Sequence, residues 1–363
     1  MDPRVERLQR RSVETQGLLS LAGGLPAAET FPVAELARAL EHTRADALQY
    51  DWPEGRAAMR AWIAARLAKR GAAVDPDDIL VTSGAQQALD IALRLAAEEG
   101  HRIAVPNACY PGALELFASY GCELVAAETP ANLAYTMPVV ENPTGRALTD
   151  EERGALVAAN HWLVEDDAYA ELRFDGHVPA PLLAAARERV LHVGTLSKTL
   201  CPGLRVGWLV VPPRLREAAR RVKHETDLQG NTLAQSIVES YLSNNDYDER
   251  LASLRRFYAQ KAEALMVALR RRLPECLFEE PGGGFSLWLT TGKSWDDVEL
   301  LRIAMRCGTS FDPGRDFRRD GASRPLAMRL AFSSIPAGDI DEAVARLART
   351  FDEAARTPGL TGA

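Results

Sequence analysis

One lysine of the sequence, Lys198, lies in the segment GTLSKTLCPGLRVGW (194–208), directly after the buried-strand pattern RVLHVG. Lysine side chains are usually solvated on the surface, whereas this one is bracketed by Thr195, Ser197 and apolar residues. Arg205 follows seven residues later. The pattern predicts an amine that emerges at the end of a strand, among hydroxyl groups and near a guanidinium.

A second polar group comes where the strand in VTSGAQQALD ends, at Thr82. A helix is expected to begin near Ala85, so that the backbone amides of Gly84, Ala85 and Gln86 point at one place with the helix dipole behind them. A phosphate group fits such a place. Taken alone, the segment is more typical of an ordinary strand-to-helix turn than of a phosphate site.

Three further segments carry polar residues at strand ends or inside strands. WLVEDDAYAEL delivers Asp166, with Tyr169 three residues later, and its carboxylates either form a solvated turn or pair with a buried cation. Asn142 in VVENPTG is typical of a turn cap. Arg329 in RLAFSS lies within a strand, where a guanidinium is costly unless an anion or an internal carboxylate meets it.

The elements that must position these residues alternate along the first two thirds of the chain. Apolar runs such as DILVTSG, RIAVPN, CELVAAE, HWLVEDD, RVLHVG and RVGWLVV are separated by helical patterns. This alternation predicts a mostly parallel sheet with right-handed crossovers and a ligand beyond the carboxyl ends of its strands. After about residue 212, long helices of period 3.6 and a few strands predict a smaller α+β region.

Composition places further limits on the function. The 363 residues favour a large domain with a smaller partner, and a net charge of −7 with dispersed Lys and Arg argues against a nucleic-acid partner. The five cysteines form no CxxC pair and the six histidines no HxxxH spacing, so we expect reduced thiols and no protein-bound metal. Neither a signal peptide nor a membrane span is apparent, so a cytoplasmic protein is expected.

Taken in order, these segments resemble the fold-type I pyridoxal-5'-phosphate aminotransferases, in the branch of the aminoadipate, kynurenine and broad-range aromatic enzymes. The matching stretches extend over almost the whole chain and include LSLAGGLPAAETFP, LQYDWPEG, VTSGAQQALD, YPGAL, ENPTG, VEDDAY, GTLSKTLCPGLRVGW, PGGGFSLWL and MRLAFSS. The resemblance implies an α/β fold whose large domain has a mostly parallel seven-stranded sheet. It implies cofactor binding in residues 41–245, a small α+β domain in 246–363, and an N-terminal segment, 1–40, that joins the small domain and covers the site.

The resemblance also implies roles for individual residues. Lys198 is expected to form the internal aldimine with pyridoxal 5'-phosphate, and Asp166 to keep the ring nitrogen protonated. The remaining expected cofactor contacts are Gly84, Ala85, Gln86, Thr195, Ser197 and Arg205 at the phosphate, Tyr110 stacked on the ring, and Asn142 and Tyr169 at the phenolic oxygen. The substrate is expected to meet Gly24, Asn142 and, through its α-carboxylate, Arg329.

The implied reaction is transamination in two half-reactions. The freed amine of Lys198 removes the α-proton of an L-amino acid and returns it to the cofactor carbon, a 2-oxo acid leaves, and a second 2-oxo acid reverses the sequence. Tyr50 is expected to reach the phosphate of a neighbouring subunit, which implies a homodimer with shared active sites. A role in amino-acid metabolism or biosynthesis follows from this chemistry.

The sequence departs from the family in several places. Ala85 and Thr195 stand where relatives often have serine, and only 31 residues lie between Tyr110 and Asn142, where relatives usually carry an extra helix. Asp51 is most simply a surface turn residue; if it borders the partner's pocket instead, it favours a substrate with a cationic side chain. Arg7 is either solvated or placed to meet a distal carboxylate.

Two other functions remain open at this stage. β- or γ-elimination, decarboxylation or cyclisation can use the same lysine, aspartate and phosphate contacts, because the cofactor carries the difficult step. Some bacterial regulators attach this fold to a DNA-binding winged helix and use the cofactor as a sensor. The 22 residues before GGLP are too few for such a domain and the chain is acidic, so we expect no regulator of that type. A stand-alone sensor that binds the cofactor without turnover stays open as the less favoured alternative.

Overall fold

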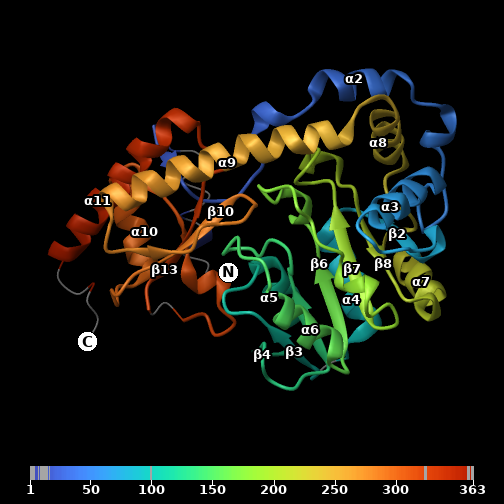
Figure 1. The fold of residues 1–363 in the computed structure, drawn as a ribbon, viewed down its shortest axis with the longest axis horizontal. Helices are drawn as coiled ribbons and strands as arrows, with labels where there is room; N and C mark the ends of the chain where they lie inside the picture. The colour runs from blue at the N-terminus through green and yellow to red at the C-terminus, as the bar shows by residue number, and fades with distance from the viewer. Residues whose placement is uncertain are drawn as a thin grey trace.

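A seven-stranded sheet forms the centre of the larger part of the molecule in the computed structural model, which describes residues 5, 6, 8, 15, 17–98, 100–322, 325–357 and 360 (Figure 1). Its strand order is β2-β8-β7-β6-β5-β3-β4. The strands are β2 (Ile79–Thr82), β3 (Arg102–Val105), β4 (Glu123–Ala126), β5 (Leu133–Thr136), β6 (Trp162–Asp166), β7 (Val190–Thr195) and β8 (Gly207–Val210).

The predicted mostly parallel sheet is confirmed. The pairs β3–β4, β3–β5, β5–β6 and β6–β7 are parallel, and only β8 runs antiparallel to its neighbours β7 and β2. Strand β5 lies in the segment between Tyr110 and Asn142, and it was not among the strands expected from the sequence. It is short, but every one of its residues is buried between β3 and β6.

Helices cover both faces of this sheet, because successive side chains of each strand point to opposite faces. In β2, Leu80 packs into one apolar core together with α4, whereas Ile79 and Val81 pack into the other together with α3. The helices around the sheet are α3 (Ala57–Lys69), α4 (Ala85–Ala96), α5 (Pro111–Ser119), α6 (Asp150–Ala158), α7 (Arg216–Asp227) and α8 (Thr232–Asn244).

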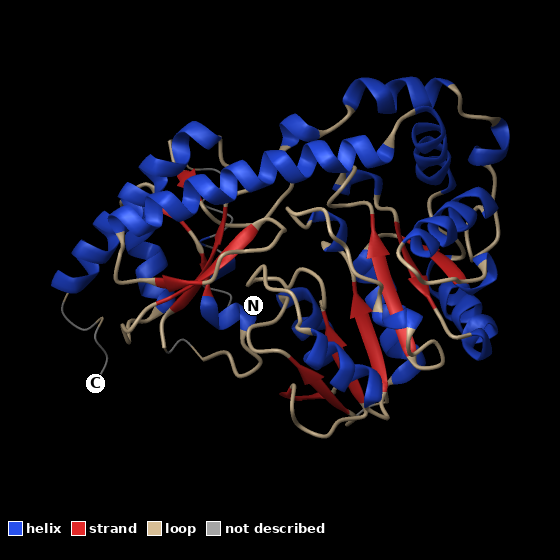
Figure 2. Ribbon diagram, viewed as in Figure 1, coloured by secondary structure: helices blue, strands red, loops and turns tan. Residues whose placement is uncertain are grey.

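A second, antiparallel sheet of four strands, ordered β12-β13-β10-β9, forms the core of the C-terminal part (Figure 2). Its strands are β9 (Leu277–Phe278), β10 (Ser286–Thr290), β12 (Asp312–Pro313) and β13 (Ala327–Ala331). Helix α9 (Tyr247–Arg272) extends along both parts of the molecule, and α10 (Asp297–Arg306) and α11 (Ile340–Arg356) lie beside the second sheet.

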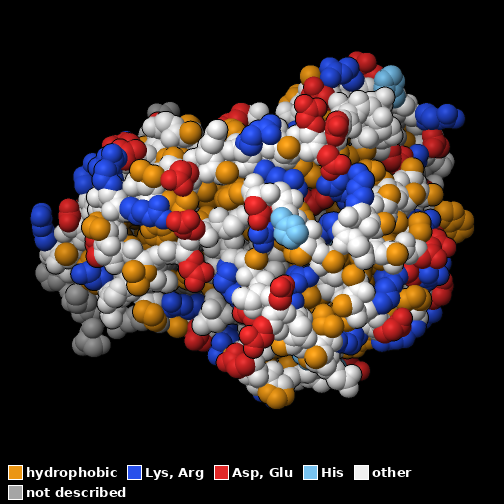
Figure 3. Space-filling model, in the orientation of Figure 1, with side chains coloured by type: hydrophobic (Ala, Val, Ile, Leu, Met, Phe, Trp, Pro, Cys, Tyr) orange, Lys and Arg blue, Asp and Glu red, His pale blue; other side chains and the backbone are white. Residues whose placement is uncertain are grey.

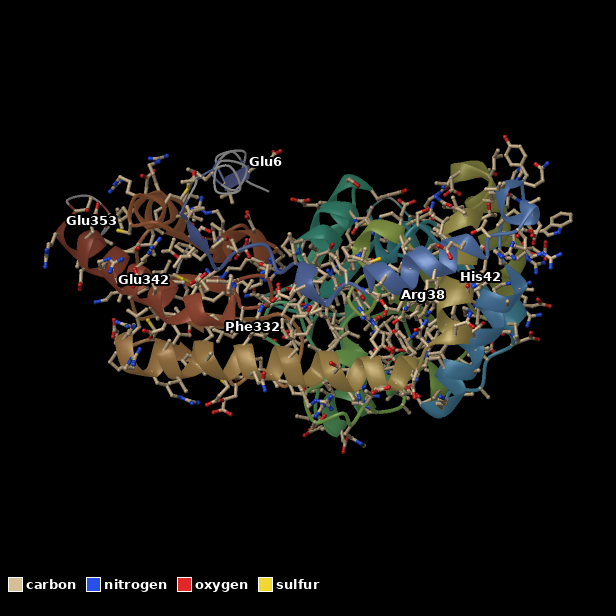
Figure 4. All side chains as sticks on the ribbon, turned by 90° about the horizontal axis from the view of Figure 1, so that it is seen from above. Glu6, Arg38, His42, Phe332, Glu342 and Glu353 are labelled. Carbon is tan, nitrogen blue, oxygen red and sulfur yellow. The ribbon has the colours of Figure 1, made fainter. Side chains whose placement is uncertain are left out.

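The N-terminal segment bridges the two parts. Its strand β1 (Leu19–Ser20) pairs in parallel with β11 (Thr309–Ser310), and helix α2 (Val33–Glu41) packs against α8 at the other end. Figure 4 shows this separation: Arg38 and His42 mark the α2 end, and Glu342 and Glu353 on α11 the opposite end. The domain limits at residues 40 and 245 stay predictions.

The surface shows no large area of one charge sign on the face seen in Figure 3, where Lys and Arg alternate with Asp and Glu. Among the helices of the described residues, none combines the length and the apolar character that crossing a membrane requires.

Candidate active site

A cavity of about 600 Å³ lies where the first sheet, the N-terminal segment and the second sheet meet. Five of the predicted site residues, far apart in the sequence, contribute to its wall: Gly24, Tyr110, Tyr169, Lys198 and Arg329. The wall also includes Asp312, Asp316, Phe317 and Glu115, which sequence reasoning did not single out. Tyr110, Tyr169 and Lys198 follow β3, β6 and β7 of the first sheet, whereas Gly24 comes from the N-terminal segment and Arg329 from within β13.

Lys198 follows β7 and the buried Leu196, so the amine is carried out of the sheet edge and into the cavity. Its Nζ lies 5.2 Å from the centre of the Tyr169 ring and 5.9 Å from that of Phe285. Tyr169 and Phe285 themselves meet edge to face. Two packed aromatic rings therefore fix the direction in which the amine points.

An anion cradle forms where β2 ends and α4 begins. Gly84 caps α4 with φ of 83°, and a Cβ built on it would lie 2.5 Å from Nη2 of Arg205. The guanidinium of Arg205 donates to the carbonyl of Ser83 at 2.9 Å and lies 3.5 Å from the Ser197 hydroxyl. The absence of a side chain at Gly84 thus lets the guanidinium approach the amide groups that begin the helix.

These donors suit a phosphate group. The first amides of α4, at Ala85 and Gln86, have no acceptor one turn earlier in the helix, and the helix dipole favours a negative charge in front of them. Arg205 adds a planar, charged donor set and Ser197 a hydroxyl group. The chemistry of the cradle therefore fits the phosphate of pyridoxal 5'-phosphate.

Thr195 supports this cradle from within the chain. Its hydroxyl accepts from the backbone amide of Ser197 at 3.1 Å and lies 3.0 Å from the carbonyl of Val206 and 2.9 Å from the Ser197 hydroxyl. These bonds hold the turn that presents Ser197. The predicted contact between Thr195 and the phosphate stays a prediction.

Asp166 is buried at the end of β6, the strand that pairs with β7, which leads to Lys198. Burial raises the pKa of its carboxyl group to about 6, although hydrogen bonds from the Tyr135 hydroxyl (2.8 Å) and the Ala168 amide (3.1 Å) favour the charged form. A carboxylate buried in this way gains most when a cation stands opposite it. A protonated pyridine nitrogen is such a cation.

Tyr135, the donor to Asp166, was not predicted from the sequence. It lies on β5, the neighbour of β6, and it is fully buried against Phe117. The sequence signal was a tyrosine in the short apolar run LAYT, which by itself is typical of any core residue.

Tyr110 caps α5 and lies close to both the cradle and Asp166. Its hydroxyl donates to the side chain of Gln86 at 3.4 Å, and the Gln86 amide donates to the carbonyl of Gly112 at 3.1 Å. Burial, together with the charge of Asp166, raises the pKa of Tyr110 to about 12. The ring is thus a neutral surface next to the cradle, as a stacking partner requires.

Arg329 is held in the middle of β13 by residues of two other segments. Its Nε and Nη2 donate to one oxygen of Asp312, at 2.9 and 2.7 Å, and its Nη1 donates to the side-chain oxygen of Asn142 at 3.0 Å. The sequence left open whether an anion or an internal carboxylate meets Arg329. The structure supplies the carboxylate, and it also brings Asn142 to the guanidinium.

Two of the remaining predicted positions lie away from the cavity. Tyr50 is 78% exposed, so the described residues of the same chain leave most of its side chain uncovered. The Asp51 amide donates to the Gln229 side chain, and its carboxylate accepts from the Trp52 amide at 2.8 Å, directly before the turn in which the Gly55 amide donates to the Trp52 carbonyl. Arg7 lies outside the described residues, so its predicted contact is not addressed.

Comparisons with known proteins point to one family. Residues 17–347 match the model of aminotransferase class I and II. The chain is 33% identical to aromatic-amino-acid aminotransferase 1 of Thermococcus litoralis, over 94% of this chain and 89% of that protein. It is 31% identical to the uncharacterised HTH-type transcriptional regulator YdcR of Escherichia coli, over 83% of this chain and 70% of the regulator.

A solved structure extends the likeness to the fold. LysN, the α-aminoadipate aminotransferase of Thermus thermophilus, in complex with N-(5'-phosphopyridoxyl)-L-leucine, superimposes with a TM-score of 0.87 at 30% identity, covering 98% of each chain. The expected fold and cofactor are thereby confirmed. The chain belongs to the class I and II aminotransferase family, and it is a pyridoxal-5'-phosphate-dependent aminotransferase.

Proposed function

We propose that the residues around the cavity carry out transamination between an L-amino acid and a 2-oxo acid, with Lys198 as the group that moves the proton. The observation that carries this proposal is the convergence of Lys198 and Arg329 on one cavity, whose wall residue Tyr110 feels the charge of the buried Asp166. A base for the α-proton and a site for the α-carboxylate are the two groups that an amino acid needs in order to react at its α-carbon.

Pyridoxal 5'-phosphate, when bound, supplies an aldehyde carbon that takes up the amino group and a ring that delocalises the negative charge left at the α-carbon. Arg205, Ser197 and the first amides of α4 would hold its phosphate, and Tyr110 would lie against its ring. Asn142 and Tyr169 would donate to the phenolic oxygen. Each of these groups binds or orients, and none is required to change its protonation state.

Asp166 would hold the proton at the ring nitrogen. Burial raises the pKa of its carboxyl group when no cation lies opposite. A protonated ring nitrogen that faces the carboxylate would be such a cation and would stabilise its charged form. Tyr135 would keep the carboxylate turned toward that nitrogen, since its hydroxyl occupies the other direction. Stabilisation of developing charge by a fixed, buried partner is commonly the largest contribution to catalysis.

The substrate would be oriented between Arg329 and Lys198. Arg329 binds the α-carboxylate, which leaves the α-hydrogen facing the amine, and the amine of Lys198 moves that proton between the two carbon atoms. Gly24, which lies against the Arg329 guanidinium, leaves room for the substrate because it has no side chain.

We further infer that the protein works as a homodimer with shared active sites. Large apolar side chains are exposed at Leu48 (71%), Tyr50 (78%), Trp52 (74%) and Leu228 (50%). They belong to one surface, because the Asp51 amide donates to the side chain of Gln229. The same surface borders the cradle, where Gln87 donates to Asp227 at 2.7 Å. A second copy that covers it would bring its own Tyr50 toward this phosphate.

We place the protein in the cytoplasm and in amino-acid metabolism or biosynthesis. The five cysteines are free thiols in the structure, and the reaction interconverts amino acids and 2-oxo acids. Detection of the native protein in the soluble cell fraction together with an amino acid substrate would support this placement, and secretion would contradict it.

The reaction is tested by single-turnover absorbance. The purified holoenzyme is mixed with a panel of L-amino acids, and the cofactor band is expected to shift to that of the aminated cofactor and to return when a 2-oxo acid is added. Lys198→Ala should abolish this exchange, whereas Lys69→Ala, which removes an exposed lysine paired with Asp248, should not. Release of ammonia, carbon dioxide or a cyclic product would assign an elimination, decarboxylation or cyclisation instead, and binding without turnover would indicate a sensor.

The dimer is tested by sedimentation velocity. Leu48→Asp is expected to convert a dimer into monomers and to weaken cofactor retention, because a charge is placed in the apolar surface. Leu277→Asp is the matched control, since Leu277 is exposed to a similar extent (69%) on β9, in the other part of the molecule. A wild-type monomer, or dissociation caused equally by both variants, would contradict the shared site.

A further inference from the structure

The carboxylate that meets Arg329 is placed by strand register. Asp312 on β12 and Arg329 on β13 are direct partners across the antiparallel pair, so both side chains leave the sheet on the same face. Trp288 faces Arg329 from the other side, on β10. Both Asp312 and Arg329 are buried and both line the cavity. The contact is therefore built into the second sheet and does not depend on a mobile side chain.

The contact engages one side of the guanidinium and leaves another available. A guanidinium has five N–H groups, one on Nε and two on each terminal nitrogen. Asp312 takes the Nε–H and one N–H of Nη2, and Asn142 takes one N–H of Nη1. One N–H on each terminal nitrogen has no acceptor among the described residues. Two charged donors, one on each terminal nitrogen, are therefore left for a carboxylate, which can accept through both of its oxygens.

The faces of the guanidinium are also covered. The Phe317 ring centre lies 4.8 Å from its central carbon, and a Cβ built on Gly24 would lie 3.3 Å from the same atom. The backbone that passes over this face is tied to the same carboxylate, because the Gly23 amide donates to both oxygens of Asp312, at 3.0 and 3.2 Å. Asp312 thus fixes both the guanidinium and the loop above it.

We propose that Asp312 is a positioning residue of the substrate site, which holds Arg329 so that its two remaining terminal N–H groups face the α-carboxylate of the substrate. The inference rests on the proposed function, in which Arg329 binds that carboxylate. Asp312 does not touch the reacting atoms. Its effect is expected in the affinity for carboxylate ligands and not in the chemistry at Lys198.

Loss of the Asp312 charge and loss of the orientation that Asp312 imposes on Arg329 should change carboxylate affinity in opposite directions. The Asp312 carboxylate, next to the two remaining donors of Arg329, repels an incoming carboxylate, so removal of the Asp312 charge alone should strengthen carboxylate binding. A loss of affinity in Asp312→Ala therefore reports a loss of orientation. Asp312→Asn separates the two effects, because a single oxygen of Asp312 accepts both bonds from Arg329 and one from Gly23, and an amide oxygen can replace it.

The experiment is isothermal titration of the holoenzyme with 3-phenylpropanoate, an unreactive monocarboxylate, and with 3-phenylpropanamide, its uncharged counterpart. We expect Asp312→Ala to raise the Kd of the carboxylate roughly tenfold to a hundredfold, as for other misplaced binding groups, and to leave the Kd of the amide within about threefold. Asp312→Asn should bind the carboxylate at least as tightly as the wild type. In steady-state kinetics the Ala variant should raise KM more than it lowers kcat.

Four results would overturn the inference: wild-type affinity in Asp312→Ala, equal losses for the carboxylate and the amide, an Asn variant as weak as the Ala variant, or no preference of the wild type for the carboxylate. If Asp312→Ala does not fold, Asp312→Ser takes its place, since its hydroxyl is too short to reach the guanidinium. A wild type that binds 3-phenylpropanoate in this pattern but converts no amino acid would contradict the proposed function and leave this inference standing. If the wild type converts an amino acid and the Asp312 variants bind 3-phenylpropanoate as the wild type does, the proposed function stands and this inference is contradicted.

Discussion

Replacement of Asp166 by asparagine is expected to stabilise the cofactor-free protein at neutral pH while it removes the activity. In the folded chain the carboxyl is buried and its pKa is raised to about 6, whereas an unfolded chain has an ordinary aspartate. Asparagine keeps both hydrogen bonds: its oxygen can accept from the Ala168 amide, and its amide can donate to the Tyr135 hydroxyl, which is both donor and acceptor.

The size and the pH window follow from linkage. A folded pKa near 6 against about 3.9 in the unfolded chain means that the folded state binds more protons between these values, so stability is lost as the pH rises through 6. Two pKa units correspond to about 3 kcal/mol. The asparagine variant escapes this loss, so its advantage should be below about 1 kcal/mol at pH 4, about 1–2 kcal/mol at pH 5 and about 3 kcal/mol above pH 7.

The assay is urea unfolding of both proteins at a series of pH values after removal of the cofactor, with the exposed Asp352→Asn as a control that should change little. Activity of the holoenzyme is measured in parallel and should fall strongly in Asp166→Asn alone. An advantage of Asp166→Asn that does not grow with pH, or a variant less stable than the wild type at pH 7.5, would refute the account of a carboxylate kept costly by burial.

Two further predictions concern the support of the site. Arg70→Met should lower the free energy of unfolding by about 3–5 kcal/mol, because it removes the arginine that pairs with the buried carboxylate of Asp167. Urea titration measures this change. The control Arg38→Met, which removes an exposed ion pair on α2, should lower the free energy of unfolding by less than about 1 kcal/mol. Gly84→Ala should weaken retention of pyridoxal 5'-phosphate at least tenfold in equilibrium dialysis, because its Cβ would clash with the Arg205 guanidinium and the backbone φ there is positive. The control Gly203→Ala has open space around it and should retain the cofactor as the wild type does. Equal retention by both variants would contradict the proposed phosphate cradle.

Much of the site could be predicted because its residues follow strong local patterns. Asp166 ends a five-residue buried strand and Gly84 precedes an amphipathic helix, and in each case the neighbouring residues determine the position. The alternation of strands and helices then brings the carboxyl ends of β6 and β7 to one edge of the sheet. Pattern and topology thus predicted a ligand at this edge, and the resemblance to the aminotransferases assigned Lys198 and Tyr169 to it; both line the same cavity.

The supporting residues could not be predicted, because their partners are set by register between strands. Tyr135 reaches Asp166 only since β5 lies beside β6, and the four residues of β5 give too short a pattern to be recognised. Asp312 precedes a proline and is typical of a turn residue until β12 is paired with β13. The pairing of β1 with β11 joins residues 290 positions apart and leaves no local trace.

Helix α9 connects the segment that follows Lys198 to the C-terminal part of the molecule (Figure 1). Near its first turn, Arg250 donates to the carbonyls of Thr199 (2.7 Å) and Leu200 (3.1 Å), the two residues after Lys198. The 26 residues of the helix span about 39 Å and reach the second sheet. A tilt of about 5° at the first turn would displace the far end by roughly 3 Å, so α9 links the position of the segment after Lys198 to that of the second sheet, which carries Arg329.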